Sequence, residues 1–197
     1  MSGKNNPDKD ILKQIENLPT LRPKGGLSPA QLAERACFAN TILHQAHQIY
    51  WKNKHSTKAK EAWLDSVENF HQAVSDVYPK GFFEHFEGFC KGEQRHLEMY
   101  LSFLELNLWF FRSGYLKADI MRVLKRTKLD DIQTKRVRSV ILDAIKQHYR
   151  REFRSYCRLA QKVDCSEFRL ELDKLLNHED KDISRRASWV LEYCERK

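Results

Sequence analysis

The segment from Leu97 to Phe111 is the feature that most limits how this chain can fold. At 100° per residue, apolar side chains cover nearly the whole circumference of a helix through it, and only a narrow stripe that includes Glu98, Ser102 and Glu105 is polar. A helix of this kind has to be enclosed by other helices. Since a membrane-spanning helix needs about 20 apolar residues, we predict a buried central helix over residues 93–112 instead.

The rest of the chain repeats the apolar spacing of three and four residues that is typical of amphipathic helices, and no segment alternates as a strand does. Ser28, Pro29 and Gln31 form a capping-box start for a helix that runs to about Asn53. Further helices are predicted over about 56–78, 81–91, 115–126, 131–163, 166–177 and 183–195. The predicted fold class is therefore all-α, a compact multi-helix bundle.

Two parts of the chain are distinguished by their composition. Residues 1–27 have a polar start and the Pro- and Gly-rich stretch PTLRPKGG, so we expect a flexible lead and linker with one or two amphipathic turns at 8–18, followed by a single helical domain over 28–197. Near the C-terminus, Ile183, Ala187 and Val190 stand where the second helix of a HEAT-type pair places its small and apolar residues. Residues 168–194 thus resemble one HEAT-like helix pair, with no clear second copy upstream.

The positive charge of the chain is concentrated in one segment. The whole chain has 35 Lys and Arg against 27 Asp and Glu, a net charge of +8, but residues 112–162 alone hold 15 basic and 5 acidic residues. On a single helix over 131–163, most of these basic side chains would lie opposite the apolar edge. Such a cationic ridge predicts an anionic partner, and Arg, which dominates from position 150 on, matches the geometry of phosphate oxygens.

The charge pattern leads to a functional prediction. We expect a non-enzymatic helical binding module whose long basic helix (about 131–163) contacts the phosphates of DNA or RNA. The predicted contact residues are Arg136, Lys146, Arg150, Arg151, Arg154, Arg158 and Lys162, with Lys125, Arg126 and Lys128 as a further group. The alternative is a helical adaptor or scaffold that binds an acidic protein segment. We expect no membrane partner, because the aromatic residues of the ridge helix are needed in the core.

A third class, a metal-binding helical-bundle enzyme, is suggested by two E-x-x-H motifs, Glu68–His71 and Glu93–His96. In carboxylate-bridged di-iron bundles such motifs project from two helices, and two other helices each add a lone Glu. The two motifs lie too close in sequence for that symmetry, and no nucleophile, P-loop or dinucleotide-binding motif occurs. We therefore predict no cofactor, no metal and no catalytic residue, and we interpret Glu98 and Glu105 as members of a salt-bridged seam.

The five cysteines indicate a reducing compartment. They are odd in number, widely spaced and without a C-x-x-C pair, so neither a disulfide framework nor a paired-cysteine zinc site is expected. The first ten residues lack the apolar core of a signal peptide. These features predict a cytoplasmic protein, with the nucleus as the alternative in a eukaryote.

Overall fold

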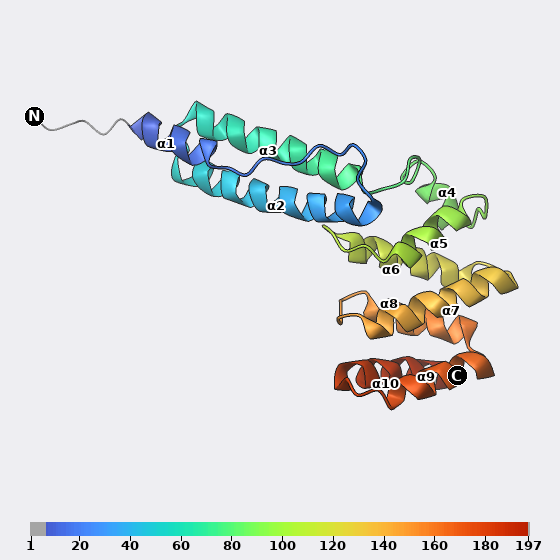
Figure 1. The fold of residues 1–197 in the computed structure, drawn as a ribbon. Coiled ribbons are helices and arrows are strands. Elements are labelled where there is room, and N and C mark those ends of the chain that lie inside the picture. The colour runs from blue at the N-terminus through green and yellow to red at the C-terminus, as the bar shows by residue number, and fades with distance from the viewer. Residues whose placement is uncertain (1–6, 197) are drawn as a thin grey trace, which may run out of the picture. The chain divides into compact units, whose positions relative to one another are not determined.

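Helices make up all of the regular secondary structure that the computed structural model describes, which covers residues 7–196 (Figure 1). No strand occurs in this range, so the all-α prediction is confirmed. Contacts between residues divide the chain into two compact units, one that ends at Pro79 and one that begins at Lys80. The domain that we expected over 28–197 therefore includes part of the first unit and the whole of the second.

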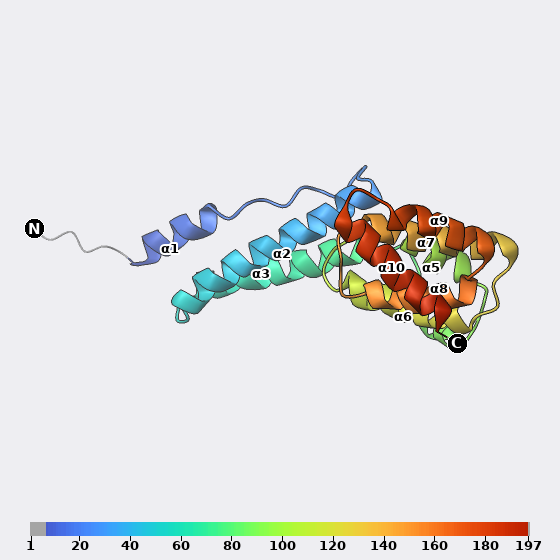
Figure 2. The same cartoon turned by 90° about the horizontal axis from the view of Figure 1, so that it is seen from below.

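The first unit is built on an antiparallel helical hairpin (Figure 2). Its helices are α2 (Pro29–Lys52) and α3 (Thr57–Ser75). The capping box predicted at the start of α2 is present, because the Gln31 amide N–H donates to Ser28 Oγ at 3.3 Å and the Ser28 amide donates to Gln31 Oε1 at 2.9 Å. Small buried residues let the two helices approach closely; they include Ala33, Ala36, Ala39 and Ala46 on α2 and Ala59 and Ala73 on α3.

The N-terminal lead contacts this hairpin. Residues 1–6 lie outside the described part, and α1 (Pro7–Glu16) follows and packs against both α2 and α3 with Ile11 buried. Farther along, Lys24 Nζ lies 2.9 Å from Asp76 Oδ1, and Arg35 Nη1 lies 3.1 Å from Asp76 Oδ2. These cations hold the pKa of Asp76 below its usual value, against the raising effect of burial.

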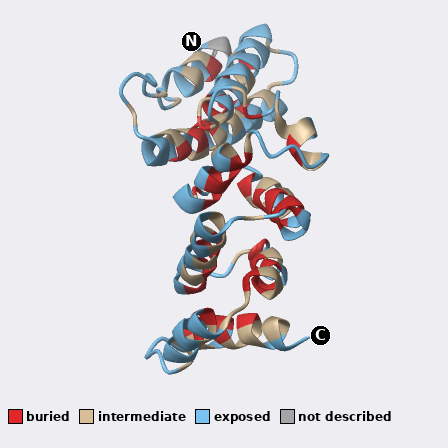
Figure 3. Cartoon of the chain, turned by 90° about the vertical axis from the view of Figure 1, so that its right-hand side faces the viewer, coloured by how far each residue is buried: buried red, intermediate tan, exposed pale blue. Residues whose placement is uncertain are grey.

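The helices of the second unit lie in two layers. After the short helix α4 (Phe86–Cys90) come α5 (Leu97–Leu106), α6 (Ser113–Arg126), α7 (Asp131–Lys146), α8 (Phe153–Val163), α9 (Ser166–Leu176) and α10 (Lys181–Glu195), and α7 packs against α8 and α9 against α10. One layer follows the contacts α5–α7–α9 and the other follows α6–α8–α10. Their buried residues face one another between the layers (Figure 3). The residues of the predicted HEAT-like pair, 168–194, belong to α9 and α10, which pack against each other.

The predicted central helix over 93–112 is wrong in its extent. The helix α5 begins at Leu97 and ends at Leu106, and Asn107 follows in the left-handed region with φ 43°. Asn is one of the few residues that adopt this conformation readily. Its side chain is fixed from elsewhere in the unit, because Lys117 Nζ donates to Asn107 Oδ1 at 2.6 Å and Asn107 Nδ2 donates to Gln147 Oε1 at 2.7 Å. The helical part of the segment is therefore only the ten residues of α5, although Leu108 and Phe110 beyond its end are also buried.

The predicted nine-turn helix over 131–163 is also wrong, because α7 ends at Lys146 and α8 begins at Phe153. Gln147 is extended, with ψ 173°. The Ile145 carbonyl, which a continuing helix would pair with the amide four residues later, accepts instead from buried Arg186 Nε at 2.6 Å. A tertiary hydrogen bond thus ends α7 where the sequence has neither Gly nor Pro.

Two further observations concern the whole of the described part. All five cysteines are free thiols. None of the helices between residues 7 and 196 combines the length and the apolar character that crossing a membrane requires.

Candidate nucleic-acid interface

The structure separates the predicted phosphate-contact residues instead of aligning them on one ridge. Arg136 and Lys146 belong to α7, in one layer of the second unit. Most of the others belong to α6 and α8 in the other layer, or to the turn just before α8. The break between α7 and α8 therefore leaves two different basic surfaces.

Arg136 on α7 is engaged in ion pairs with two acids of α5. Its guanidinium donates to both carboxylate oxygens of Glu105, from Nε at 2.6 Å and from Nη2 at 2.8 Å, and Nη1 pairs with Glu98 Oε2. The hydrogen bonds from Arg136 lower the pKa of Glu105. The salt-bridged seam predicted for the two glutamates is present, and its cation is Arg136 of α7. Lys146, also on α7, lies 3.9 Å from Asp143.

The helices α6 and α8 lie side by side and point in the same direction. Near their starts, Arg151 Nη1 donates to the Tyr115 hydroxyl, and near their ends, Lys125 Nζ donates to Gln161 Oε1 at 3.1 Å. Exposed basic side chains lie along both helices and in the turn just before α8, and we call this set the α6–α8 basic face. It comprises Arg122, Lys125, Arg126, Arg151, Arg154 and Arg158. The acidic residue on these two helices is Asp119, so the face has a strong excess of positive charge.

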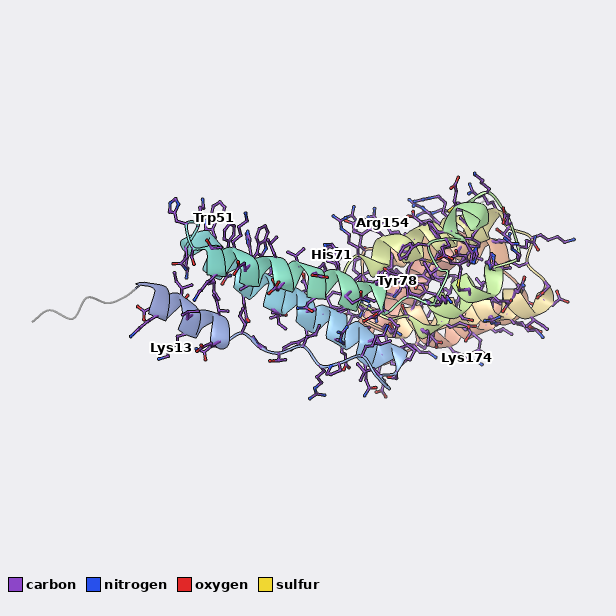
Figure 4. The ribbon with its side chains drawn as sticks, turned by 90° about the horizontal axis from the view of Figure 1, so that it is seen from above. Lys13, Trp51, His71, Tyr78, Arg154 and Lys174 are labelled. Atoms are coloured by element: carbon purple, nitrogen blue, oxygen red, sulfur yellow. The ribbon has the colours of Figure 1, made fainter. Side chains whose placement is uncertain are left out.

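The members of the α6–α8 basic face differ in how they are engaged. Among residues 7–196, Arg154 and Arg158 have no hydrogen bond or ion pair, and Arg154 extends away from the ribbon (Figure 4). Arg122 Nη1 lies 2.6 Å from Asp119 Oδ1, a pair that is exposed and therefore weak. Arg126 donates to the Cys90 carbonyl. The two arginines without partners are thus the members best placed to meet an anion.

Three other predicted residues lie at the margins of this face. Lys162 is half-buried, donates to the backbone carbonyls of Lys125 and Thr127, and has a pKa lowered by burial. Lys128 is exposed in the turn between α6 and α7. Arg150 precedes α8, and its Nη1 is the buried side-chain nitrogen that lacks a hydrogen-bond partner within the described residues.

A buried polar cluster lies beneath the start of α6. Lys117 is fully buried, and burial lowers its pKa to about 8, although the nearby Glu152 carboxylate opposes that shift. Glu152 is buried as well, and its Oε2 occupies the space beside Gly114, where an added Cβ would lie 2.6 Å away. The Glu152 carboxylate thus lies at the N-terminal turn of α6, where a negative charge stabilises the helix by interacting with its dipole.

Sequence reasoning missed two groups of residues at this surface. Arg122 was not among the predicted contacts, although its spacing of four residues from Arg126 places both on one side of a helix. The helical pattern placed Trp109 in the polar stripe and Phe111 on the apolar side, and did not single out Tyr115, whereas the structure exposes all three. Their position follows from the end of α5 at Leu106, which the sequence did not reveal.

The candidate metal ligands are not brought together. No group of three or more His, Cys, Asp or Glu side chains within the described residues is arranged to hold a metal ion. The His96 ring stacks on the His85 ring at 3.7 Å between centroids, and Arg95 Nε donates to His96 Nε2 at 3.0 Å. His71 contacts the ring of Phe70 on its own helix.

Comparison with known proteins gives no relative from which a function could be transferred. No family model matches the chain, and neither the curated proteins nor the solved structures contain a significant match.

Proposed function

We propose that this protein binds nucleic acid and that the α6–α8 basic face supplies the phosphate contacts. The observation that carries the proposal is the presence of five exposed basic side chains on two adjoining helices, on which Asp119 is the acidic residue, and of a sixth, Arg151, in the turn just before α8. Five of the six are arginines, whose planar guanidinium can donate two parallel hydrogen bonds to phosphate oxygens. This set replaces the cationic ridge predicted on a single helix over 131–163, and Arg136 is left out of it because it is paired with Glu98 and Glu105.

The spacing of the face suits a polyanion better than a single charged group. Arg154 and Arg158 are four residues apart and so lie on one side of α8, with Arg151 in the turn just before it, and Arg122 and Arg126 lie on one side of α6. A row of cations on a polyanion releases condensed counterions, which is the main source of sequence-independent affinity for nucleic acid. The proposed mode is therefore backbone contact without base reading.

The test is a salt titration of binding to random duplex and single-stranded oligonucleotides. The triple variant Arg122→Ala, Arg154→Ala, Arg158→Ala removes three phosphate contacts, and each contact adds about 0.9 to the slope of log K against log salt on duplex and about 0.7 on single strands. The slope should therefore decrease in magnitude by roughly two to three. The control is the triple variant Lys52→Ala, Lys58→Ala, Lys60→Ala. It removes the same amount of positive charge from exposed positions in the first unit, at the last residue of α2 and in the first turn of α3.

Two results would overturn the proposal. If the wild-type protein binds neither oligonucleotide at low salt, the α6–α8 basic face does not serve nucleic acid, and an acidic protein segment becomes the better candidate partner. If the triple variant keeps the wild-type slope, the phosphate contacts lie elsewhere on the protein.

A further inference from the structure

Three exposed aromatic rings lie next to the α6–α8 basic face. Trp109 and Phe111 belong to the segment between α5 and α6, and Tyr115 lies in the first turn of α6. Their exposed fractions are 59%, 43% and 56%, which are high for aromatic side chains. We call these three residues the aromatic platform.

The segment that carries the aromatic platform has a fixed backbone. Asn107 and Arg112 bracket it, and both are in the left-handed region, with φ 43° and 59°. Between them, the residues alternate: Leu108 and Phe110 are buried, whereas Trp109 and Phe111 face outward. The Phe110 amide donates to Ser113 Oγ at 3.1 Å, and the Asn107 side chain is held by Lys117 and Gln147. The rings are thus displayed by a segment that is anchored in the core.

Each ring of the platform is accompanied by an arginine. The guanidinium carbon of Arg150 lies 5.4 Å from the Trp109 ring centroid, that of Arg112 lies 5.3 Å from Phe111, and that of Arg151 lies 4.7 Å from Tyr115. An apolar surface built for a protein partner is usually depleted of charge at its centre. Here a cation stands at every ring, which is the combination that single-stranded nucleic acid favours: stacking for the bases and charge for the backbone.

The platform adjoins the α6–α8 basic face through Tyr115 and Arg151, which contact each other across the starts of α6 and α8. A strand whose bases stack on the rings would continue with its phosphates along Arg154 and Arg158. Bases in a duplex stack on one another and hide their faces, so a ring platform can only engage unpaired bases.

We infer that the ligand is single-stranded nucleic acid, with unpaired bases stacked on Trp109, Phe111 and Tyr115. The inference rests on the proposed function, because it assigns the class of nucleic acid that the same surface binds. It goes beyond that function by giving the aromatic residues a role that phosphate contact does not require.

The experiment measures the affinity of the full-length protein for a fluorescein-labelled single-stranded oligonucleotide and for a duplex of the same length, at one low salt concentration. Trp109→Leu keeps an apolar side chain but removes the ring. Loss of one stacked base should weaken single-strand binding by roughly 5- to 100-fold, and duplex binding should change by less than about twofold. Trp109→Phe, which keeps a ring, should restore most of the lost affinity.

The matched control is Trp51→Leu. Trp51 is 61% exposed and has Lys54 Nζ 3.6 Å above its ring, so it is an equally exposed tryptophan with its own cation, but it lies at the end of α2 in the first unit (Figure 4). This variant should change neither affinity. Circular dichroism of each variant reports whether the fold is retained.

The possible outcomes separate this inference from the proposed function. If Trp109→Leu binds both oligonucleotides as tightly as wild type does, the role of the aromatic platform is overturned and the proposed role of the α6–α8 basic face is retained. Equal losses on single strand and duplex also overturn it, because stacking of unpaired bases cannot explain them. Absence of any binding at low salt overturns the proposed function, and the platform with it.

Discussion

Arg136 of α7 forms a bidentate ion pair with Glu105 of α5, with Nε 2.6 Å from Oε1 and Nη2 2.8 Å from Oε2. The same guanidinium also pairs with Glu98, about two turns earlier on α5. Arg136 therefore joins α7 to α5. Its charge is balanced inside the protein, although its place in the sequence is within the most basic segment of the chain.

Substitution Arg136→Ala should affect stability and not nucleic-acid binding. It leaves two glutamates of one helix without their cation, and since the pair is partly exposed we expect a loss of roughly 0.5–1.5 kcal/mol in the free energy of unfolding. The measurement is urea unfolding, with exposed Lys135→Ala on the same helix as control. A variant that unfolds like wild type but loses as much nucleic-acid affinity as the triple variant of the basic face would contradict this assignment.

Replacing either of two leucines of α5 with alanine should change the stability of the protein by very different amounts. Leu104 is 1% exposed, so Leu104→Ala should destabilise the protein by roughly 2–5 kcal/mol through lost burial and the cavity left behind. Leu106, the last residue of α5, is half-exposed, and Leu106→Ala should cost less than about 0.5 kcal/mol. Similar losses at the two positions, measured by urea unfolding, would mean that α5 does not end where the structure places its end.

Lys117 should make stability depend on pH in the alkaline range. Burial lowers the pKa of Lys117 from 10.5 to about 8, so between these values the unfolded chain holds a proton that the folded protein has released. The unfolded state then binds more protons, and stability rises with pH. Relative to Lys117→Met, wild type should gain about 1.4 kcal/mol per pH unit, up to about 3 kcal/mol.

The two proteins share every cysteine and tyrosine, so the titration of those groups cancels in the difference between their unfolding curves. The measurement is urea unfolding of both proteins at several pH values from 7 to 10.5. A difference that stays constant over this range would show that Lys117 keeps an ordinary pKa in the folded protein.

Cys157 should be protected from alkylation in the folded protein. It is buried, and burial raises the pKa of its thiol to about 12, so the thiolate that attacks an alkylating reagent is scarce. Iodoacetamide at pH 8 should label Cys157 far more slowly in the native protein than in urea, as read by mass spectrometry of peptides. The partly exposed Cys165 is the internal control. Labelling of both residues at the same native rate would contradict the burial of α8.

The sequence by itself determined the fold class and most of the helices. Apolar spacing located α2, α3, α6, α9 and α10 to within a few residues, and the capping box of Ser28 and Gln31 is formed as predicted. These features are local, because helix starts and amphipathic faces depend on residues within one or two turns of each other. The segment that holds the excess positive charge was also visible in the sequence.

Only the tertiary structure decided where α5 and α7 end and which basic residues share one exposed surface. Asn107 is held by Lys117 and Gln147, and the Ile145 carbonyl is paired with Arg186, 41 residues away in sequence. Neither helix end is marked by a Gly or Pro in the sequence. The residues at these ends are held instead by hydrogen bonds from residues far away in the chain, and local sequence patterns do not show such contacts. The same contacts expose Trp109 and place Arg151 beside Tyr115. A surface of this kind depends on which helices stack side by side, and local periodicity carries no information about that.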